Sequence, residues 1–364
     1  MSHQVDIVVI GGGIIGCSIA YYLAKEGLSV HLLERNKIAQ GTTRAAGGML
    51  GAHSEYLNDI FYLFARESQE LYKAFKRDRD IGYTTGGIIQ FAHSEEERIA
   101  LSRWTHTTYL SAEQLLERIP SGAPSTFGGY LFEEDVHIHP EMACLAFCEA
   151  SKALGTTVSE HFHVDDIEEL TDGYQIHSDS TVITAKHVVI ASGGMSAKLV
   201  PGLQMTSVKG QCMQLDAKGF HLPYTLFHKG CYVVPRPDGT LVVGATMEQD
   251  NTDLQTNSTG NLALSEIAER FIPGLSSFPV VNRWAGLRPK TVDDLPYIGR
   301  IPGKKTMYIA AGHFRNGILL APATACMIRD LICENEVNTE RIDVFNPKRG
   351  IFREANNRFE RQSV

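Results

Sequence analysis

The chain has 364 residues, a formal net charge of −8 and 43% apolar residues, which is typical of a soluble globular protein with room for two domains. The acidic balance, without any lysine- or arginine-rich tract, argues against nucleic acid as a partner. The N-terminus lacks a signal-peptide pattern and no apolar run reaches the roughly eighteen residues that span a bilayer, so we expect a cytoplasmic protein with no membrane partner.

The first thirty-five residues carry the most informative pattern. An apolar, β-branched run over 5–10 predicts a buried parallel strand, and residues 11–16 follow it with the spacing G-x-G-x-x-G. Residues 17–26 then show helical spacing of apolar side chains. A second strand is predicted over 30–33, and Glu34 stands at its end. The order strand, glycines, helix, strand and acid is more specific than the glycine motif alone.

Each part of this segment has a physical reason to bind a dinucleotide. Gly11 permits a tight turn, Gly13 lets the backbone approach a pyrophosphate, and Gly16 lets the helix pack closely on the strand. The helix N-terminus offers N–H groups and partial positive charge to the phosphates. Glu34 is placed to accept hydrogen bonds from ribose hydroxyls. The alternative is a glycine-rich turn in another kind of α/β protein.

The next segment, 41–51, is small, polar and rich in glycine, which suits a backbone that closely follows a ligand; the alternative is a plain flexible loop. An amphipathic helix is predicted over 60–79 and a strand or hairpin over 83–92. Short helices are predicted over 94–101 and 111–117, each beginning at a serine suited to N-capping.

His137 and His139 lie in an alternating segment that ends at Pro140, a residue suited to the first turn of a helix predicted over 141–154. The two histidines suggest a metal site, but no third ligand of the zinc type is spaced to join them, so we predict no metal. Short strands are predicted over 156–160, 164–170, 174–177 and 181–184. A buried strand over 187–191 ends in Ser192-Gly193-Gly194, and we expect it beside the first strand–helix–strand unit.

The second half of the chain shows a pattern of antiparallel strands. Strands over 232–235 and 240–243 flank a Pro-Asp-Gly turn, which predicts a hairpin of an antiparallel sheet. A helix is predicted over 262–271. A strand over 307–311 enters a glycine turn and an apolar helix over 318–333, which again directs a helix N-terminus toward a ligand.

Both ends of the chain resemble one family. The glycine motif, GTTRAAGGML, WAGLRP and GHFRNGILLAPATA are similar to the D-amino acid oxidase family of FAD-dependent oxidoreductases, and within it to the glycine oxidases of thiamine biosynthesis. The resemblance spans nearly the whole chain, and the last block is its most specific part.

The resemblance implies an α/β fold with a Rossmann-like FAD domain and a second, antiparallel-sheet substrate domain. We predict the FAD domain in residues 1–82, 136–206 and 284–345, the substrate domain in 83–135 and 207–283, and a C-terminal tail over 346–364. The resemblance also implies a homotetramer.

FAD is expected to bind non-covalently. The seven cysteines include no C-x-x-C and are interpreted as reduced packing residues, although a flavin link through Cys144 or Cys148 is an alternative. The glycine motif and the matched family positions predict these FAD contacts: Gly11, Gly13, Ile14, Ile15, Gly16, Glu34, Arg35, Thr42, Thr43, Gly47, Gly48, Met49, Val164, His313, Phe314, Arg315, Asn316, Gly317, Ile318 and Leu319.

The implied reaction is hydride transfer from the α-carbon of a small amine to flavin N5, imine hydrolysis, and flavin reoxidation by O₂ to give hydrogen peroxide; glycine would yield glyoxylate and ammonia. Arg288 is the candidate for the substrate carboxylate, since a guanidinium matches two oxygens, and Arg315 is a second cation. Tyr232 would donate its hydroxyl to the carboxylate, Met247 would wall the pocket, and Glu55 would lie near its mouth.

Each assignment has an alternative. The alternative for Arg288 is an ion-pair residue at the surface or between domains, and the alternative for Arg315 is a residue that serves structure or the flavin only. Tyr232 and Met247 would then be packing residues, and Glu55 a solvated acid.

The chain departs from the glycine oxidase pattern at Phe227 and Gly230, where the family carries a tyrosine and a histidine. This leaves sarcosine and small D-amino acids open as substrates. Other hypotheses are a dehydrogenase of the same fold, a flavin-dependent tRNA-modification module, and a non-catalytic flavin-binding protein.

Overall fold

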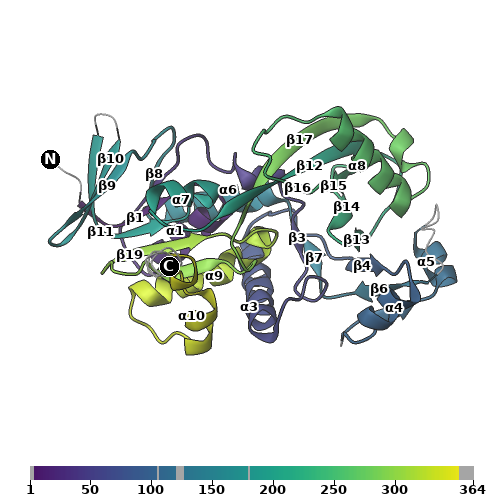
Figure 1. The fold of residues 1–364 in the computed structure, drawn as a ribbon, viewed down its shortest axis with the longest axis horizontal. Helices are drawn as coiled ribbons and strands as arrows, with labels where there is room; N and C mark the ends of the chain where they lie inside the picture. The colour runs from purple at the N-terminus through teal and green to yellow at the C-terminus, as the bar shows by residue number, and fades with distance from the viewer. Residues whose placement is uncertain (1–3, 105, 120–126, 179–180, 352–364) are drawn as a thin grey trace, which may run out of the picture.

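The computed structural model describes residues 4–104, 106–119, 127–178 and 181–351. Two sheets lie side by side in it, one built around the N-terminal strand and one from the middle of the chain (Figure 1). The first is largely parallel and the second largely antiparallel, so the expected α/β class with a Rossmann-like unit and a second sheet is confirmed.

The N-terminal strand β1 is central in the first sheet. It pairs in parallel with β2 on one side and β11 on the other, as expected for the strand that precedes Ser192. Strand β19 continues the parallel order beyond β11, and β18 closes that edge in the antiparallel sense. The strands are β18 (Tyr297–Arg300), β19 (Met307–Ala311), β11 (Thr181–Ile190), β1 (Gln4–Ile10), β2 (Val30–Leu33), β8 (Thr157–Ser159), β9 (Asp166–Leu170) and β10 (Gly173–Ser178).

Strand β1 is apolar throughout its second half because both of its faces are covered. Ile7 and Val9 pack into one hydrophobic cluster with helices α1 (Ile14–Lys25), α6 (Pro140–Ala153) and α9 (Gly317–Ile332). Val8 and Ile10 pack into another with β10 and β11 on the opposite face. A strand covered on both faces shows a continuous apolar run rather than an alternating one.

Several boundaries differ from those predicted. Helix α1 begins at Ile14, not at residue 17, because the glycine motif itself forms its first turn. The strands predicted over 181–184 and 187–191 are one strand, β11, whose first half pairs with β10 and whose second half pairs with β1 and β19. Helix α8 (Ser258–Phe271) starts four residues early, where the Asn257 side chain accepts a hydrogen bond from the Gly260 N–H.

The second sheet has helix α8 on one face. Leu264, Ile267 and Phe271 of that helix pack against Met213 and Val243 of the sheet. The hairpin predicted around the Pro-Asp-Gly turn is confirmed as β14 and β15. The strands are β16 (Glu248–Gln249), β12 (Thr206–Asp216), β15 (Thr240–Gly244), β14 (Cys231–Pro235), β13 (Thr225–His228), β4 (Ile88–Phe91), β6 (Gly129–Phe132), β5 (Thr108–Leu110) and β17 (Val280–Lys290), which pairs with β12.

Strand β17 links the two halves of the molecule. It pairs with β12 in the second sheet along its whole length, six residues past the boundary predicted at 284. Its Leu287 carbonyl accepts a hydrogen bond from the Thr42 hydroxyl at 2.8 Å, and its Pro289 carbonyl accepts one from the Phe314 N–H at 2.9 Å. The domain boundaries predicted from the sequence remain a prediction.

The remaining elements lie between and around the two sheets (Figure 1). Strands β3 (Met49–Leu50) and β7 (Val136–His137) form a small separate pair. The other helices are α2 (Thr42–Ala45), α3 (Asp59–Phe75), α4 (Glu95–Leu101), α5 (Ala112–Arg118), α7 (Ser196–Leu199), α10 (Thr339–Phe345) and α11 (Lys348–Ile351), with short 3₁₀ turns at Lys76–Asp78, Gly193–Met195 and Leu275–Ser277.

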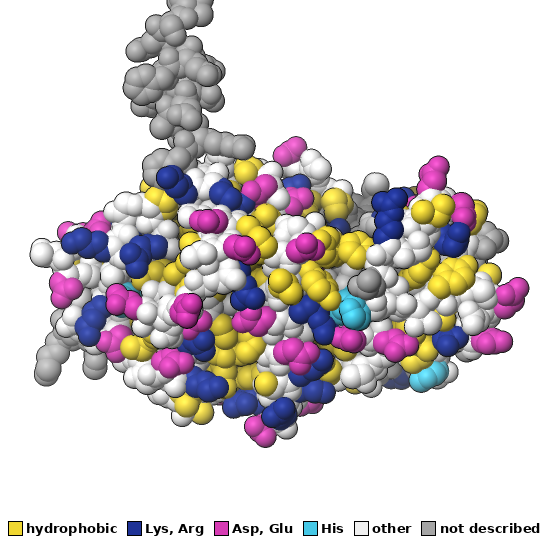
Figure 2. All heavy atoms as spheres, turned by 90° about the horizontal axis from the view of Figure 1, so that it is seen from below, with side chains coloured by type: hydrophobic (Ala, Val, Ile, Leu, Met, Phe, Trp, Pro, Cys, Tyr) yellow, Lys and Arg dark blue, Asp and Glu magenta, His cyan; other side chains and the backbone are white. Residues whose placement is uncertain are grey.

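The predicted tail is partly folded: α11 lies within it, and residues 352–364 fall outside the described residues. Within the described ranges, no helix is both long and apolar enough to span a bilayer. On the face seen in Figure 2, basic and acidic side chains are interspersed rather than gathered into a basic stripe.

Candidate active site

A cavity of about 850 Å³ lies between the two sheets. This volume is near the upper end of the roughly 300–1,000 Å³ found for small-molecule and cofactor sites. The first turns of helices α1 and α9 both line it, although about 300 residues separate them in the chain. The two strand–glycine–helix segments singled out in the sequence therefore meet at one place.

The turn between β1 and α1 forms one wall of the cavity. Gly11 has φ +117°, and a β-carbon there would lie 2.5 Å from the Ala191 carbonyl oxygen, so only glycine fits. Gly13, Ile14 and Ile15 line the cavity, and the Ile14 N–H donates to the Thr43 hydroxyl at 2.9 Å.

Glu34 lies at the carboxyl end of β2, also in the cavity wall. Its Oε2 accepts the Gly12 N–H at 2.7 Å and its Oε1 accepts the Asn36 N–H at 2.8 Å. Since a carboxylate has about four acceptor positions, it retains capacity for ribose hydroxyls. Arg35 and Val164 line the same region.

The glycine-rich segment after Thr42 forms the wall between the sheets. Gly47, Gly48 and Met49 all line the cavity, as do Thr42 and Thr43. A β-carbon at Gly47 would lie 2.8 Å from the Tyr232 ring, so glycine here lets the backbone pass close to that ring. The segment expected to follow a ligand therefore lies in the cavity wall.

At the C-terminal turn, His313, Phe314, Arg315, Gly317 and Ile318 line the cavity. The His313 ring is buried against the Thr324 hydroxyl at 3.1 Å, and burial lowers its pKa to about 3, so the ring is neutral at physiological pH.

Three predicted contact residues do not line the cavity. Gly16 packs against the Gly11 carbonyl, as its role in helix packing requires. Asn316 occupies the N-cap position of α9 without a side-chain capping hydrogen bond, and Leu319 is 1% exposed in the core. Their assignment as FAD contacts stays a prediction.

Arg288 on β17 faces the cavity from the second sheet. Its Nη1 donates to the Thr246 carbonyl at 3.2 Å, and the guanidinium lies over Gly210 of the neighbouring strand. Among the described residues, no carboxylate lies within 4 Å of it. The ion-pair alternative for Arg288 therefore finds no partner in the described chain.

Arg315 is, by contrast, paired. Its Nη2 lies 2.9 Å from Oε2 of Glu55, and both residues line the cavity. Glu55 is 14% exposed, so its interpretation as a solvated acid is wrong. Burial raises the pKa of Glu55 above 4.5, and the charge of Arg315 opposes that rise.

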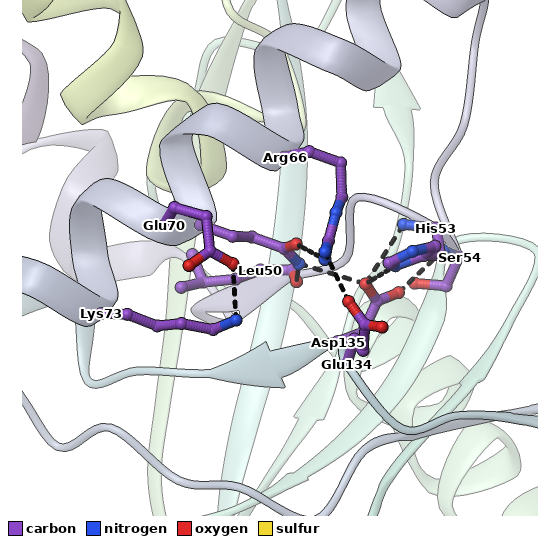
Figure 3. Close-up of polar contacts among 9 residues, drawn as sticks. Leu50, His53, Ser54, Arg66, Glu70, Lys73, Glu134 and Asp135 are labelled. Carbon is purple, nitrogen blue, oxygen red and sulfur yellow. Dashed lines mark hydrogen bonds and ion pairs between the residues drawn. The ribbon is translucent and has the colours of Figure 1, made fainter. Parts of the chain in front are cut away.

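A buried network holds His53 and Ser54, the two residues that precede Glu55 in the chain (Figure 3). The Asp135 carboxylate, 0% exposed, accepts hydrogen bonds from the His53 N–H at 3.1 Å, the Ser54 N–H at 2.8 Å and the Gln69 side-chain amide at 3.1 Å. The His53 ring Nδ1 lies 2.9 Å from the same carboxylate. These contacts fix the backbone immediately before Glu55.

Tyr232 and Met247 also line the cavity. The Tyr232 hydroxyl lies 3.5 Å from the Cys212 sulfur, and burial raises the pKa of this tyrosine well above 10, so it stays protonated and able to donate. Met247 is 52% exposed, which places it at the rim rather than in a packed wall.

The sequence analysis missed several lining residues. Phe162 and His163 lie near Glu34 because β8 pairs with β2, and Gly210 and Cys212 face the cavity from β12. A glycine inside a strand lets another group approach closely, but the sequence analysis predicted no strand where β12 lies, so Gly210 was not recognised. Lys198, from the short helix α7, and Leu254, from the segment between β16 and α8, also line the cavity and had no sequence signal.

The residues present suit FAD. Two helix N-termini provide N–H groups for phosphates or developing negative charge, Glu34 retains acceptor capacity for a ribose, and glycine backbone lines the passage between them. Cys144 and Cys148, the alternative covalent sites, are buried in the core and do not line the cavity. Within the described residues, no group of three His, Cys, Asp or Glu side chains is arranged to hold a metal ion.

Comparison with known proteins agrees with this geometry. The glycine oxidase of Bacillus subtilis (strain 168) is 40% identical, with 95% of this chain and 97% of that protein covered. The bifunctional protein ThiO/ThiG of Synechocystis sp. is 32% identical over 96% of this chain and 54% of that protein.

The crystal structure of glycine oxidase from Geobacillus kaustophilus superposes with a TM-score of 0.90 at 31% identity, covering 97% of this chain and 99% of that one. A family profile described as FAD dependent oxidoreductase, DAO, matches residues 6–331. The chain therefore belongs to the D-amino acid oxidase family of FAD-dependent oxidoreductases, and FAD is its cofactor.

Proposed function

We propose that this chain is an oxidase of glycine and other small primary or secondary amines, including sarcosine and small D-amino acids. The observation that carries the proposal is Arg288, a guanidinium without a carboxylate partner among the described residues, facing the cavity that holds both helix N-termini. The identity with named glycine oxidases supports the same substrate class.

Substrate binding follows from the charges in the cavity. Arg288 presents two N–H groups that match the two oxygens of a carboxylate, while the charge of Arg315 is compensated by Glu55. The Tyr232 hydroxyl, 3.5 Å from a sulfur that is a weak partner, is free to turn toward the same carboxylate. These residues orient the α-carbon without supplying a base.

FAD bound by the glycine turn before α1, Glu34 and the turn before α9 would supply a hydride acceptor that O₂ can reoxidise. The net reaction for glycine is glycine, O₂ and water giving glyoxylate, ammonia and hydrogen peroxide. The N-terminus of α9, through the N–H groups near Gly317, is oriented to stabilise negative charge that develops at the cavity wall. The neutral His313 ring adds no charge there.

The substrate range is set partly by Phe227 and Gly230. A β-carbon at Gly230 would lie 3.3 Å from Nη1 of Arg315, and the Phe227 ring centroid lies 5.9 Å from that guanidinium. Gly230 lines the cavity, while the Phe227 ring is buried near that guanidinium without lining the cavity. Without the side chains of a histidine and a tyrosine, this region is roomier and less polar. We therefore propose that sarcosine and D-alanine are accepted beside glycine.

The test is to mix the yellow protein with glycine in the absence of air and to follow flavin absorbance. We expect bleaching, and in air one hydrogen peroxide per glycine consumed. A flavin that glycine does not bleach would refute the proposal and favour a non-catalytic flavin-binding protein. Bleaching without peroxide formation in air would instead identify a dehydrogenase with another acceptor.

Two further parts of the proposal have their own measurements. The resemblance to glycine oxidases of thiamine biosynthesis supports a role in supplying an imine or glyoxylate for the thiazole of thiamine, which growth of a deletion strain without thiamine would test. It also supports a homotetramer, and light scattering coupled to size exclusion would give the mass in solution.

A further inference from the structure

The side of strand β12 that faces away from the cavity carries a buried pair of opposite charges. Lys209 on this strand is 0% exposed, and its Nζ has no hydrogen-bond partner among the described residues. Glu248 lies 3.7 Å from it, as the paired residue on β16. Burial of an ammonium group costs free energy unless a nearby opposite charge compensates it. The Glu248 carboxylate provides that charge for Lys209.

Glu248 is the centre of a polar cluster. Its Oε1 accepts hydrogen bonds from the Gln211 side-chain amide at 2.6 Å and from the Thr246 hydroxyl at 2.9 Å, and its Oε2 accepts one from the Asn251 side-chain amide at 2.9 Å. Burial alone would raise the pKa of Glu248, but the hydrogen bonds from Gln211 and Thr246 and the charge of Lys209 lower it. The carboxylate is therefore ionised at neutral pH.

Thr246 is held on several sides by this cluster. Its hydroxyl also accepts the Gln211 backbone N–H at 2.9 Å, and its own N–H donates to the Gln211 carbonyl at 3.2 Å. The Thr246 carbonyl in turn accepts Nη1 of Arg288 at 3.2 Å. Thr246 thus connects the ionised Glu248 on one side with the cavity guanidinium on the other.

The path of Arg288 to Thr246 crosses strand β12. Arg288 stands on β17, on one side of β12, while Thr246 lies between β15 and β16 on the other side. The guanidinium passes over Gly210, where a β-carbon would lie 2.2 Å from Nη1 and 2.5 Å from the guanidinium carbon. Any larger residue at 210 would occupy the place of the guanidinium.

We infer that Glu248 and Thr246 are positioning residues for Arg288, and that Gly210 provides the slot through which its guanidinium reaches the Thr246 carbonyl. This inference rests on the proposed function, because it assigns the cluster to orienting a substrate carboxylate. The cluster holds one N–H of the Arg288 guanidinium in a hydrogen bond to the Thr246 carbonyl. The remaining N–H donors of the guanidinium then face the cavity in a fixed orientation. Lys209 stabilises the ionised form of Glu248 on which the arrangement depends.

The test compares Thr246→Val and Thr246→Ser in the FAD-loaded enzyme, with Gln249→Ala as the matched control. Gln249 is exposed on the same short strand as Glu248 and lies outside the cavity. The measurements are KM and kcat for glycine, and the dissociation constant of acetate from the change in flavin absorbance. Acetate is the probe because it carries the carboxylate without the amine.

We expect Thr246→Val to raise both KM for glycine and the acetate dissociation constant about fivefold, the equivalent of one net hydrogen bond, with kcat unchanged. Thr246→Ser and Gln249→Ala should bind acetate as the parent enzyme does. Equal impairment of the serine and valine variants, unchanged acetate binding in the valine variant, or a fall in kcat alone would overturn the inference.

Gly210→Ala gives a second test that does not depend on folding of the valine variant. The added methyl group displaces the guanidinium, so acetate binding should weaken at least as much as in Thr246→Val; unchanged binding would remove the slot from the inference. Arg288→Ala separates the two proposals. If it leaves acetate binding unchanged, the carboxylate assignment of the proposed function fails, whereas weakened binding in Arg288→Ala with normal binding in the Thr246 and Gly210 variants refutes only the positioning role.

Discussion

The Arg315 guanidinium and the Glu55 carboxylate meet at 2.9 Å inside the cavity, although 260 positions separate them in the chain. Glu55 comes from the segment between β3 and α3, and Arg315 from the turn before α9. The pair joins these two segments and compensates the charge of Arg315, whereas Arg288 has no carboxylate partner among the described residues.

Replacement of Glu55 by glutamine should change the acid side of the pH profile. Burial raises the pKa of Glu55 above 4.5 despite the charge of Arg315, so protonation of the parent enzyme leaves Arg315 unpaired as the pH falls through that raised pKa. In Glu55→Gln, Arg315 is unpaired at every pH. We expect the parent profile of kcat/KM to show an inflection above pH 4.5 that is missing in Glu55→Gln; identical profiles would contradict the prediction.

Truncation of Arg288 should weaken substrate binding. Loss of an enclosed pairing with the glycine carboxylate costs about 2–5 kcal/mol, so KM for glycine in Arg288→Ala should rise at least about thirtyfold. The KM of Arg288→Lys for glycine should lie between those of the parent enzyme and the alanine variant, because lysine keeps the positive charge but cannot donate two parallel hydrogen bonds to a carboxylate. Arg283→Ala, exposed on the same strand, is the control, and steady-state kinetics on all three variants provide the measurement.

Asp135→Asn should destabilise the folded protein. The carboxylate accepts hydrogen bonds from two backbone N–H groups and the Gln69 amide, and an asparagine amide would turn a donor toward one of them. We expect the free energy of unfolding to fall by about 3 kcal/mol. Urea denaturation of the FAD-loaded protein measures this change. Glu133→Gln, an exposed neighbour, should leave the unfolding midpoint in place, and an unchanged midpoint in Asp135→Asn would refute the prediction.

His137 should make stability depend on pH. Burial, with a smaller effect of the Arg236 charge, lowers its pKa from 6.5 to about 3. Below pH 6.5 the unfolded chain takes up a proton that the folded protein does not, so the free energy of unfolding falls as the pH drops toward 3. His137→Gln should remove up to about 1.4 kcal/mol per pH unit of this slope.

The measurement for His137 is urea denaturation at pH 7, 6, 5 and 4. His221→Gln serves as the control, because His221 is exposed and its replacement should leave the slope unchanged. His313, whose pKa is also about 3, stays in both variants and contributes equally to them. A slope in His137→Gln equal to that of the parent protein would refute the assignment.

The sequence predicted those parts of the fold that depend on neighbouring residues. The β1–α1–β2 unit, the β14–β15 hairpin and the strand leading into α9 were recognised because their turns, glycines and periodicity are local. Strand β11 was divided in two because its pairing changes along its length: a hairpin partner covers its first half and the central sheet its second. This change of pairing partner depends on the arrangement of the whole sheet, which a local sequence pattern does not show.

Likewise, only part of the candidate site could be predicted from the sequence, because the other part depends on contacts between distant segments. Arg288, Tyr232 and the C-terminal glycine turn were reached through a family resemblance, and the structure brings them together. The pairing of Arg315 with Glu55 and the passage of Arg288 over Gly210 depend on the register of β12 with β17 and on contacts between distant segments. No local pattern encodes such contacts, so they became visible only in three dimensions.

Strand β17 imposes a mechanical limit on how the enzyme admits its substrate. The strand pairs with β12 in the second sheet, and its carbonyls also accept hydrogen bonds from Thr42 and Phe314. The two halves of the molecule therefore cannot rotate apart about a hinge without breaking those hydrogen bonds. Substrate and product must therefore enter and leave through small movements at the cavity rim, where Met247 and Leu254 are exposed. Turnover should accordingly be sensitive to solvent viscosity and to larger side chains at these two rim positions.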